Sequence, residues 1–585
     1  MGCSATRSPH EGAREWRAHC SLALAGLIVG AVPSQGAAQC FTMQLSSPSQ
    51  SSGDHFGQVL AADGSWLVVG ANYSATTFLR DDLGTHVDAT DDLWLVNAHF
   101  LSEDPFKSDG FGWAVAVEGD HMLVGAPFWP SSVFGSGPGA VYFYRRVVGA
   151  SHGPEDDAWV QQALIEGPLP GTHGGSFGIA VSIEEDRAAV GATNTKLDSQ
   201  PFWYGLVHVF RVDDGGTPLD PADDTWVPEA ALTPANPALS EDFGAAIAFD
   251  GPNLLIGSPP DLFSEVGSAY HFRLDDGGTP TDPSDDLWIE HAKLTQPLSS
   301  TVQKFGAAVD LDGSRALIGS DGEVFVFELD NAGTVTDPAD DYWVDAGVLD
   351  SADAGEPEDF GMAVSLEGDR ALVGARYKFS GLTEGIAYLF MKSPSVGSGL
   401  DNESTWTEVT KLAAPSPPAL GVGWAVKLEG DQAIVGERGS FPFLTGDGSD
   451  IAFGAALIFA MATPPWEFIE APQAGVLDPP CLLGGGTLLP DTETVLAIDH
   501  AESAATTAVV VGLAELQAPI KGGVLVPAPD FVLGLMTDEA GSVTVDARWP
   551  AGVPAGFEFF IQAWVLDPSA PGTYASTNAL HVEVP

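Results

Sequence analysis

The sequence has few basic residues, and this shortage excludes several classes of protein. Of its 585 residues only 23 are Lys or Arg, against 80 Asp or Glu, and the net charge is −57. Such a chain repels phosphate backbones and anionic lipids, which excludes nucleic-acid binding as a main role and disfavours anionic membranes. The acidic balance favours cations, basic partners or simple solubility in saline surroundings.

Long apolar runs are also missing. The apolar stretch near the start, Leu22–Val32, has 11 residues, and a membrane helix needs about 20. Three arginines precede this stretch and small residues follow at 36–38, a pattern typical of a secretory signal over residues 1–38. We therefore expect a secreted, extracellular or cell-surface protein without a transmembrane anchor. Two alternatives stay open, N-myristoylation at Gly2 and lipidation of Cys40.

One phrase recurs seven times in the sequence. It starts with Phe-Gly, continues with alternating small and β-branched residues, turns, and closes with an apolar run ending on Gly, as in FGWAVAVEGDHMLVGA and FGMAVSLEGDRALVGA. Successive Phe copies are 55 to 66 residues apart, which is too long for a helical solenoid and somewhat above the usual length of a propeller blade. The copies begin at Phe56, Phe111, Phe177, Phe243, Phe305, Phe360 and Val422.

Each copy predicts four short antiparallel strands. The alternation after Phe-Gly has the period of a strand, and a Gly-bearing turn leads into a second strand. A third apolar strand such as Val207–Arg211 and a fourth such as Trp226–Leu232 follow. Glycine and alanine are expected where the innermost strands crowd around an axis. We assign residues 41–470 to this repeat domain.

Spacing also predicts how the ring closes. A Leu ends the fourth strand 11 residues before the next Phe in three copies, and Leu45 lies 11 residues before Phe56. The segment Phe41–Leu45 therefore reads as a fourth strand without a preceding copy of its own. We predict that it pairs with Ala455–Phe459 and so removes the exposed edges of an open ring.

Only Cys40 and Cys481 remain after removal of residues 1–38, which also leaves 20 basic and 78 acidic residues. Two cysteines in an exported protein suggest a single disulfide, and two free thiols are the alternative. A Cys40–Cys481 bridge would close a loop of several hundred residues. The loop-entropy model gives such a bridge on the order of 5 kcal/mol.

The pattern changes after the two prolines at 464–465. No Phe-Gly phrase follows, and short apolar segments alternate with Gly, Pro and Asp turns. We predict an all-β chain whose residues 473–585 form a small antiparallel, Ig-like β-sandwich. The predicted strands there include Thr494–Ile498, Thr507–Val511, Ser542–Ala547 and Phe557–Leu566.

Acidic loops separate the third and fourth strands of four copies. Each has carboxylates at offsets 0, 7, 10 and 11 and Trp at offset 13, with Asn331 and Gly residues among the turn formers of the loop at Asp330. Oxygen-rich loops suit Ca²⁺, but turn formation and edge protection by charge explain the same residues. The candidate Ca²⁺ ligands are Asp213, Asp220, Asp223 and Asp224 in one loop and Asp275, Asp282, Asp285 and Asp286 in another.

The phrase FG, AV, turn, VGA resembles the FG-GAP repeat of the integrin α-subunit propeller. The resemblance covers about residues 41–470 and implies a seven-bladed β-propeller that presents loops to a partner, often in adhesion. The family's calcium loop DxDxDGxxD is missing, since that position holds only short turns such as EGD, EED or DGS. No family metal ligand is therefore carried over.

The end of the chain is similar to carboxy-terminal β-domains of large bacterial exoproteins. The resemblance rests on GGVLVPAPDF from Gly522, TDEAGSVTVDARWP from Thr537, FIQAWVLDP from Phe560 and STNAL from Ser576. It implies secretion or surface display and no activity.

Three motifs that would point to an enzyme, HExxH, a P-loop and CxxC, do not occur in the sequence. His208 and His271 lie within apolar third strands and are expected to be packed side chains. We expect a monomeric, non-enzymatic protein that binds a protein or glycan on a propeller face. Two alternatives are a hydrolase or lyase with its site in the central funnel, and a structural envelope or matrix protein.

Overall fold

The structure is a computed structural model of the chain. Within its described part no helix is long and apolar enough to cross a membrane. The proposed signal peptide and Cys40 lie outside the described residues. The described residues are 41–49, 54–81, 92–103, 109–130, 137–149, 156–167, 172–197, 204–213, 215, 224–236, 242–260, 267–278, 285–297, 303–331, 341–351, 359–376, 385–392, 405–414, 421–439, 454–461, 466–470, 480–485, 488–489, 492–499, 501–520, 523–539, 541–550, 553–568, 570 and 573–584.

Seven four-stranded antiparallel sheets, here numbered I to VII, occur among these residues. Sheet I has β2 (Val59–Asp63), β3 (Trp66–Ala71), β4 (Ser74–Asp81) and β5 (Leu93–Leu101); sheet II has β6 (Ala114–Glu118), β7 (His121–Ala126), β8 (Ala140–Val147) and β9 (Ala158–Glu166). Sheet III has β10 (Thr172–Glu184), β11 (Arg187–Leu197), β12 (Leu206–Asp213) and β13 (Thr225–Leu232); sheet IV has β14 (Ala246–Asp250), β15 (Asn253–Ser258), β16 (Ser268–Asp275) and β17 (Leu287–Leu294).

The remaining three sheets repeat this order. Sheet V has β18 (Gln303–Asp312), β19 (Arg315–Asp321), β20 (Val324–Asp330) and β21 (Tyr342–Leu349); sheet VI has β22 (Phe360–Glu367), β23 (Arg370–Ala375), β24 (Ile386–Lys392) and β25 (Trp406–Leu412). Sheet VII has β26 (Val422–Glu429), β27 (Gln432–Glu437), β28 (Ala455–Ala460) and, as its outer strand, β1 (Phe41–Ser46).

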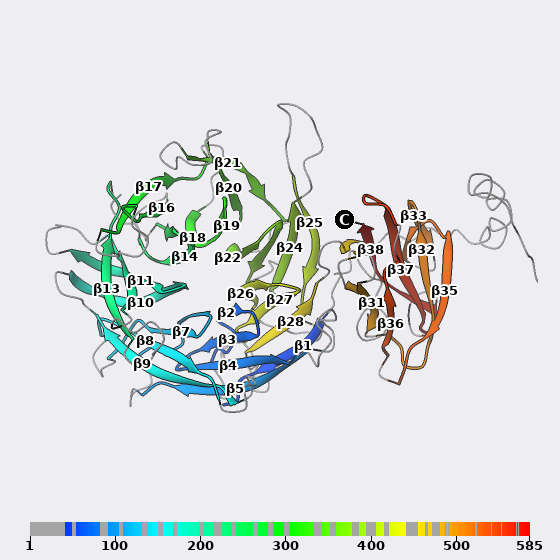
Figure 1. The fold of residues 1–585 in the computed structure, drawn as a ribbon, viewed down its shortest axis with the longest axis horizontal. Helices are drawn as coiled ribbons and strands as arrows, with labels where there is room; N and C mark the ends of the chain where they lie inside the picture. Colours follow the sequence, from blue (N-terminus) through cyan, green and yellow to red (C-terminus); the bar gives the residue numbers. More distant parts are fainter. Residues whose placement is uncertain are drawn as a thin grey trace, which may run out of the picture.

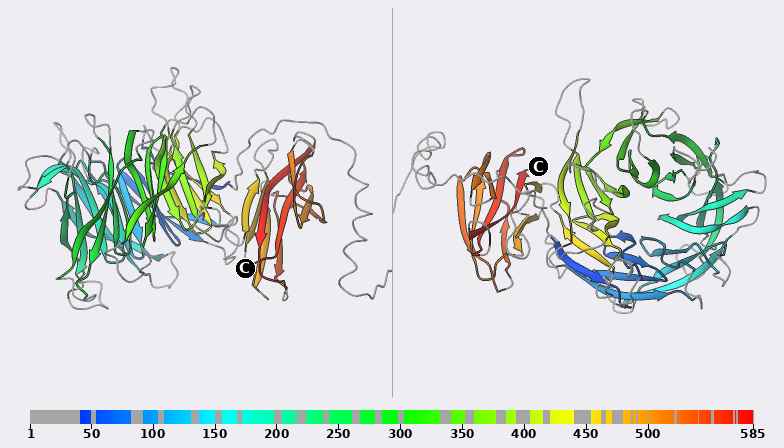
Figure 2. Two further views of the ribbon diagram at one scale, coloured as in Figure 1. Left: turned by 90° about the horizontal axis from the view of Figure 1, so that it is seen from above. Right: turned by 180° about the vertical axis from the view of Figure 1, so that it is seen from behind.

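The sheets are arranged around a central axis, with the first strand of each innermost (Figures 1 and 2). Neighbouring inner strands contact one another in order, and β26 contacts β2. The predicted pairing of the chain's beginning with the last sheet is confirmed, because Phe41 lies opposite Phe459 and Leu45 opposite Ala456. The prediction of an all-β chain with repeated sheets of four antiparallel strands is confirmed as well.

The Phe of each Phe-Gly phrase is a core residue. All six are at most 2 % exposed, and Val422 takes the same place in sheet VII with 0 %. Each ring packs edge-on against an aromatic side chain of the third strand in its own sheet, as Phe111 does against Tyr142 at a centroid distance of 4.9 Å. Such pairs contribute about 0.5–1.5 kcal/mol beyond their buried area.

The two glycines of each phrase meet at the joints between sheets. The Gly of Phe-Gly has φ between 78° and 91° in all seven copies, a range that favours glycine. The closing Gly lies against the carbonyl of the next sheet's Phe-Gly glycine, so a Cβ there would collide with backbone. These contacts run around the whole ring: Gly70 to Gly112, Gly125 to Gly178, Gly191 to Gly244, Gly257 to Gly306, Gly319 to Gly361, Gly374 to Gly423 and Gly436 to Gly57.

A Gly191→Ala substitution tests this close approach. Its methyl group would overlap the Gly244 carbonyl, so we expect a loss of about 2 kcal/mol or more in the free energy of unfolding. Gly313→Ala is the control, because Gly313 has φ 58° and no atom within 4 Å of a built Cβ, and it should cost only about 1 kcal/mol. If urea unfolding gives the two variants equal losses in the free energy of unfolding, the proposed close contact between Gly191 and Gly244 is contradicted.

The C-terminal region contains three sheets. The five-stranded sheet has the order β29 (Trp466–Glu470), β38 (Tyr574–Glu583), β37 (Glu558–Leu566), β32 (Thr506–Gly512) and β35 (Phe531–Met536). The three-stranded sheet has β30 (Cys481–Gly485), β31 (Glu493–Asp499) and β36 (Val543–Arg548), and β33 (Glu515–Ile520) pairs with β34 (Gly523–Pro527). The first two sheets share one apolar core, to which Leu482 and Ile498 contribute from one side and Ile561 and Leu580 from the other.

Buried polar side chains connect these C-terminal sheets. The Asn578 amide bonds to both the N–H and the carbonyl of Leu482, each at 2.8 Å. Gln562 is fully buried and accepts from the Val526 N–H while its amide donates to the Val524 carbonyl. Buried polar groups need hydrogen-bond partners, and these bonds supply them. They join residues of three motifs noted in the sequence, GGVLVPAPDF, FIQAWVLDP and STNAL.

Candidate functional site

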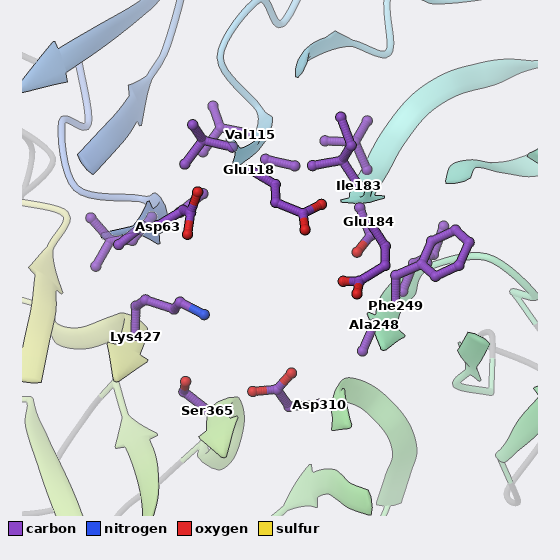
Figure 3. Close-up of a pocket in the computed structure, with 18 of the residues that line it drawn as sticks. Asp63, Val115, Glu118, Ile183, Glu184, Ala248, Phe249, Asp310, Ser365 and Lys427 are labelled. Atoms are coloured by element: carbon purple, nitrogen blue, oxygen red, sulfur yellow. The ribbon is translucent and has the colours of Figure 1, made fainter. Parts of the chain in front are cut away.

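The seven inner strands enclose a central cavity of about 380 Å³ (Figure 3). Its lining includes residues at two positions of the repeat phrase, offset 5 in all seven sheets and offset 7 in sheets I, II, III and VII. Side chains two residues apart on a strand point to the same side, so both layers face the axis. Alternation therefore decides which residues reach the cavity.

The layer at offset 7 is a carboxylate in every sheet. Each carboxylate accepts a hydrogen bond from the backbone N–H of the turn in the next sheet, and six of these bonds measure between 2.6 and 3.2 Å. We call these seven residues the carboxylate ring. Its bonds run from Gly64 to Glu429, Gly119 to Asp63, Glu185 to Glu118, Gly251 to Glu184, Gly313 to Asp250, Gly368 to Asp312 and Gly430 to Glu367.

Burial raises the pKa of four members of the carboxylate ring. Desolvation is the main cause that raises the pKa of Glu118 to about 7, and the neighbouring carboxylates Glu184, Asp63 and Glu185 add to it, against the Glu185 N–H bond. Desolvation also raises the pKa values of Glu184, Asp250 and Glu429. Glu118 is therefore partly protonated near neutral pH.

The layer at offset 5 breaks the repeat. Sheets I to IV have small residues there, whereas sheets V, VI and VII have Asp310, Ser365 and Lys427. All three point into the central space (Figure 3). We call them the polar triad. The four small residues opposite are Ala61, Ala116, Ser182 and Ala248.

Two members of the polar triad are fixed by backbone hydrogen bonds. Asp310 accepts from the N–H groups of Leu366, at 2.7 Å, and Leu311, at 3.0 Å. The Ser365 hydroxyl accepts from the Leu428 N–H at 3.0 Å. Both side chains thereby bind the next sheet, as the carboxylate ring does. Desolvation raises the pKa of Asp310, while the Lys427 charge acts in the opposite direction.

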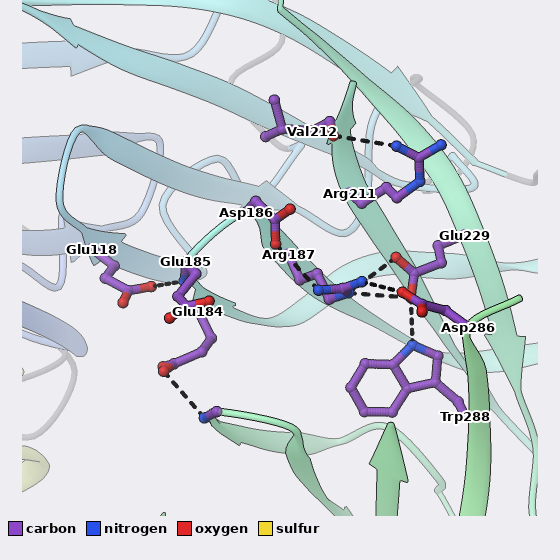
Figure 4. A network of polar contacts seen from close by, with 11 residues as sticks. Glu118, Glu184, Glu185, Asp186, Arg187, Arg211, Val212, Glu229, Asp286 and Trp288 are labelled. Carbon is purple, nitrogen blue, oxygen red and sulfur yellow. Dashed lines mark hydrogen bonds and ion pairs between the residues drawn. The ribbon is translucent and has the colours of Figure 1, made fainter. Parts of the chain in front are cut away.

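The acidic loops are bonded to arginines of the preceding sheet. The Asp286 carboxylate lies 2.5 Å from Nη2 of Arg187, which also contacts Glu229 (Figure 4). Asp224 forms the equivalent pair with Arg145. These two predicted calcium ligands therefore have their charge matched by arginine, and they join neighbouring sheets.

The other predicted calcium ligands are placed only in part. Asp213 and Asp275 accept from the N–H groups of Gly215, at 3.2 Å, and Gly277, at 3.1 Å, as turn formers do. Asp285 lies beside Gly277, and Asp220, Asp223 and Asp282 lie outside the described residues. Among the residues that are described, no group of three or more His, Cys, Asp or Glu is arranged to hold a metal.

The Trp at offset 13 extends the same contact between sheets. The Trp288 indole N–H donates to Glu229 at 2.7 Å (Figure 4), and the Trp94 indole donates to Gln432 at 2.9 Å. The Asp and Trp side chains of one loop therefore both bond to the neighbouring sheet. This accounts for their fixed spacing without a metal ion.

The expectation that His208 and His271 are packed side chains is confirmed. They are 4 % and 1 % exposed. Desolvation lowers the pKa of His208 to about 4 and that of His271 to about 3, the latter with help from His291 and Arg273. Both imidazoles are therefore neutral at physiological pH and face away from the cavity lining.

Two segments match a family model that is described as the FG-GAP repeat. They are residues 94–144 and 343–390, which run from the fourth strand of one sheet to the third strand of the next. The chain carries FG-GAP repeats. No curated protein matches the sequence. The FG-GAP phrase thus spans the joint between sheets, where the glycine contacts and carboxylate-ring bonds lie.

Sequence reasoning missed both cavity layers, although each left a signal. The carboxylate ring is visible as an acid at offset 7 of all seven phrases, as in AVEGD and KLEGD, but we read these residues only as turns too short for an ion. The polar triad is visible through two departures from small residues at offset 5, Asp310 and Lys427, which flank Ser365 in consecutive copies. Neither signal says which way the side chains point until the strands are placed around an axis.

Replacing Glu118 with Gln tests the electrostatics of the carboxylate ring. Because its pKa is raised from 4.5 to about 7, Glu118 favours the folded state most below pH 4.5 and loses that contribution as the pH rises to about 7. Gln keeps an acceptor for the Glu185 N–H without the charge. We expect a Tm about 1–2 °C above the parent at pH 8 and no gain at pH 4.5.

Glu367→Gln is the matched control for this measurement. Glu367 makes the same ring bond, to Gly430, but also pairs with Arg370 at 3.2 Å. Removing its charge breaks this ion pair, so no gain in Tm is expected at pH 8. A Glu118→Gln variant less stable than the parent at pH 8 would contradict the interpretation.

Proposed function

We propose that the chain is a secreted, non-enzymatic β-propeller that binds a protein or glycan partner outside the cell. The observation that carries this proposal is the FG-GAP repeat on consecutive four-stranded sheets set around one axis. FG-GAP repeats are typical of propellers that present loops to extracellular partners. Sheets I to VII are the seven blades, and the propeller ends after β28 rather than at residue 470, because β29 (Trp466–Glu470) pairs with β38 in the C-terminal sheet.

The second domain, expected over residues 473–585, is an Ig-like β-sandwich that also takes in β29 (Trp466–Glu470). Two antiparallel sheets that share an apolar core support this assignment. Its role is that of a spacer or surface module, and residues 1–38 are removed on export. We infer a monomer located outside the cell or at its surface, with the partner on one propeller face.

The non-enzymatic assignment rests on how the cavity carboxylates are used. All seven members of the carboxylate ring make the same bond to the next sheet, which is a structural task repeated in every blade. Among the described residues that line the cavity, none is His, Arg or Cys. Any chemistry in this lining would therefore have to use its carboxylates, Lys427 and the two serines.

One observation favours the alternative of a hydrolase or lyase. The pKa of Glu118, about 7, matches what a general acid or base needs, and Glu184 lies close enough to affect it. A structural envelope or matrix protein is a third reading, because acidic, repeat-rich surfaces also suit that role. Binding and turnover assays distinguish these three functions: a binding protein, a hydrolase or lyase, and a structural protein.

The test uses the secreted chain after removal of its leader. Immobilised protein is exposed to glycan arrays and purified extracellular proteins, and the same batch is assayed for turnover of chromogenic glycosides, esters and uronate polymers. We expect saturable binding to one partner class and no turnover. Turnover that Glu118→Gln abolishes would establish the hydrolase or lyase; neither binding nor turnover would favour the structural role.

We further propose a Cys40–Cys481 disulfide. Cys481 is 1 % exposed and packs with Ala460 at the end of β28, and Phe41, the neighbour of Cys40, pairs with Phe459 of the same strand. Cys481 and the strand that begins one residue after Cys40 therefore meet at one end of sheet VII. Titration of thiols in denaturant should find none, and two free thiols would refute the bridge.

For calcium we propose a reduced ligand set. Asp224 and Asp286 are paired with arginines, so Ca²⁺ binding would use Asp213, Asp220 and Asp223 in one loop and Asp275, Asp282 and Asp285 in the other. With three carboxylates per loop we expect dissociation constants in the range of extracellular modules, about 10⁻⁴ to 10⁻³ M. Calorimetric titration of chelator-treated protein checks this, and no binding at millimolar Ca²⁺ would remove calcium from the proposal.

A further inference from the structure

The polar triad is the one asymmetric feature of an otherwise repeated cavity lining. Asp310, Ser365 and Lys427 come from three consecutive sheets, and the four remaining sheets place alanine or serine in the same layer. A task shared by all blades would use the same residue in each. Three different polar residues side by side point to a task that is done once per molecule.

Lys427 is the member with unused bonding capacity. Its ammonium projects into the central space (Figure 3), and within the described part of the chain it makes no hydrogen bond and no ion pair within 4 Å. Its charge acts on Asp310 and Glu429 at longer range. Three N–H donors therefore face the cavity from a fixed strand.

Asp310 and Ser365 add complementary groups beside Lys427. The backbone bonds to Leu366, Leu311 and Leu428 hold both side chains in place. The Ser365 hydroxyl accepts from backbone and so keeps its own hydrogen for donation, while the Asp310 oxygens keep lone pairs for acceptance. The polar triad thus offers fixed donors and acceptors on one wall.

Charge restricts which ligands can reach this wall. Anions are repelled by the carboxylate ring, which lies two residues further along the strands, and cations are repelled by Lys427. The opposite wall carries the small side chains of Ala61, Ala116, Ser182 and Ala248. A volume of about 380 Å³ falls within the range of small-molecule sites.

We propose that the polar triad binds a neutral polyhydroxylated ligand, such as one sugar unit of a glycan, inside the central cavity. Each hydroxyl can accept from Lys427 or donate to Asp310, and the small side chains of the opposite wall leave space for the ring of a sugar. The inference rests on the proposed function. It takes the case in which the partner is a glycan and names the subsite and the ligand class.

The experiment measures binding of single sugars by saturation-transfer NMR and calorimetry with the secreted chain. The probes are D-glucose, D-galactose, D-mannose and D-xylose, with ethanolamine as cation and lactate as anion. We expect at least one sugar to bind and both ions to bind more weakly. Lys427→Met and Asp310→Asn should each weaken sugar binding about tenfold or more, because each removes a charge-assisted hydrogen bond.

Lys411→Met is the matched control. Lys411 lies on β25, away from the cavity lining, and pairs with Glu408 at 3.4 Å, so sugar affinity should equal that of the parent. Ser365→Ala gives a second variant of the triad should either charge change lower the Tm. A loss of affinity in Lys411→Met equal to that in Lys427→Met would overturn the site.

Two further outcomes would also overturn the inference. One is no binding of any sugar, and the other is ethanolamine binding more tightly than every sugar, which would assign the cavity to cations. If partner binding on arrays persists in Lys427→Met, the proposed function stands while the inference fails. If arrays and sugars are both negative, the proposed function fails with it.

Discussion

The whole ring depends on backbone meeting backbone at the joints between sheets. At each joint a glycine without a side chain lies against the carbonyl of the next sheet's Phe-Gly glycine, and the seven contacts form a closed cycle. A single added methyl group has no space there, since the opposing atoms are main chain. This close approach requires glycine at the closing position, and the positive φ of the Phe-Gly glycine favours glycine there too. The buried Phe side chains pack into the core beside these glycines.

A second cycle of contacts uses charge in place of close packing. The carboxylate ring caps the turn of every neighbouring sheet, and on the outer side arginines such as Arg187 connect the acidic loops in the same direction. Acidic residues in this chain therefore serve the joints as well as solubility. Desolvated carboxylates facing one axis are costly as anions, which explains why burial raises several of their pKa values.

Residues that recur in all seven sheets can be distinguished from residues that occur in only some of them. Features present in all seven sheets, such as the Phe-Gly turn and the carboxylate ring, follow from the geometry of assembly. The polar triad occupies one layer of three adjacent sheets, and it faces the central cavity. A binding role fits such a departure better than a structural one.

Much of the architecture could be predicted from the sequence, because its period and alternation are local. Strand order within the repeats and the pairing of Phe41–Ser46 with β28 followed from spacing alone. The site could not be predicted in this way. The loop pattern makes Asp224 and Asp286 candidate calcium ligands, but each pairs with an arginine that is distant in sequence, Arg145 or Arg187. Asp310 and Lys427 are 117 residues apart, so the sequence does not show that they line one cavity.

Native-state hydrogen exchange followed by mass spectrometry tests the closed ring most directly. If β1 completes sheet VII, amides of residues 41–46 are protected as strongly as those of 455–460, and both segments become exchangeable in one cooperative step as denaturant is added. Free exchange of residues 41–46 while 455–460 stay protected would show an open ring and contradict the account.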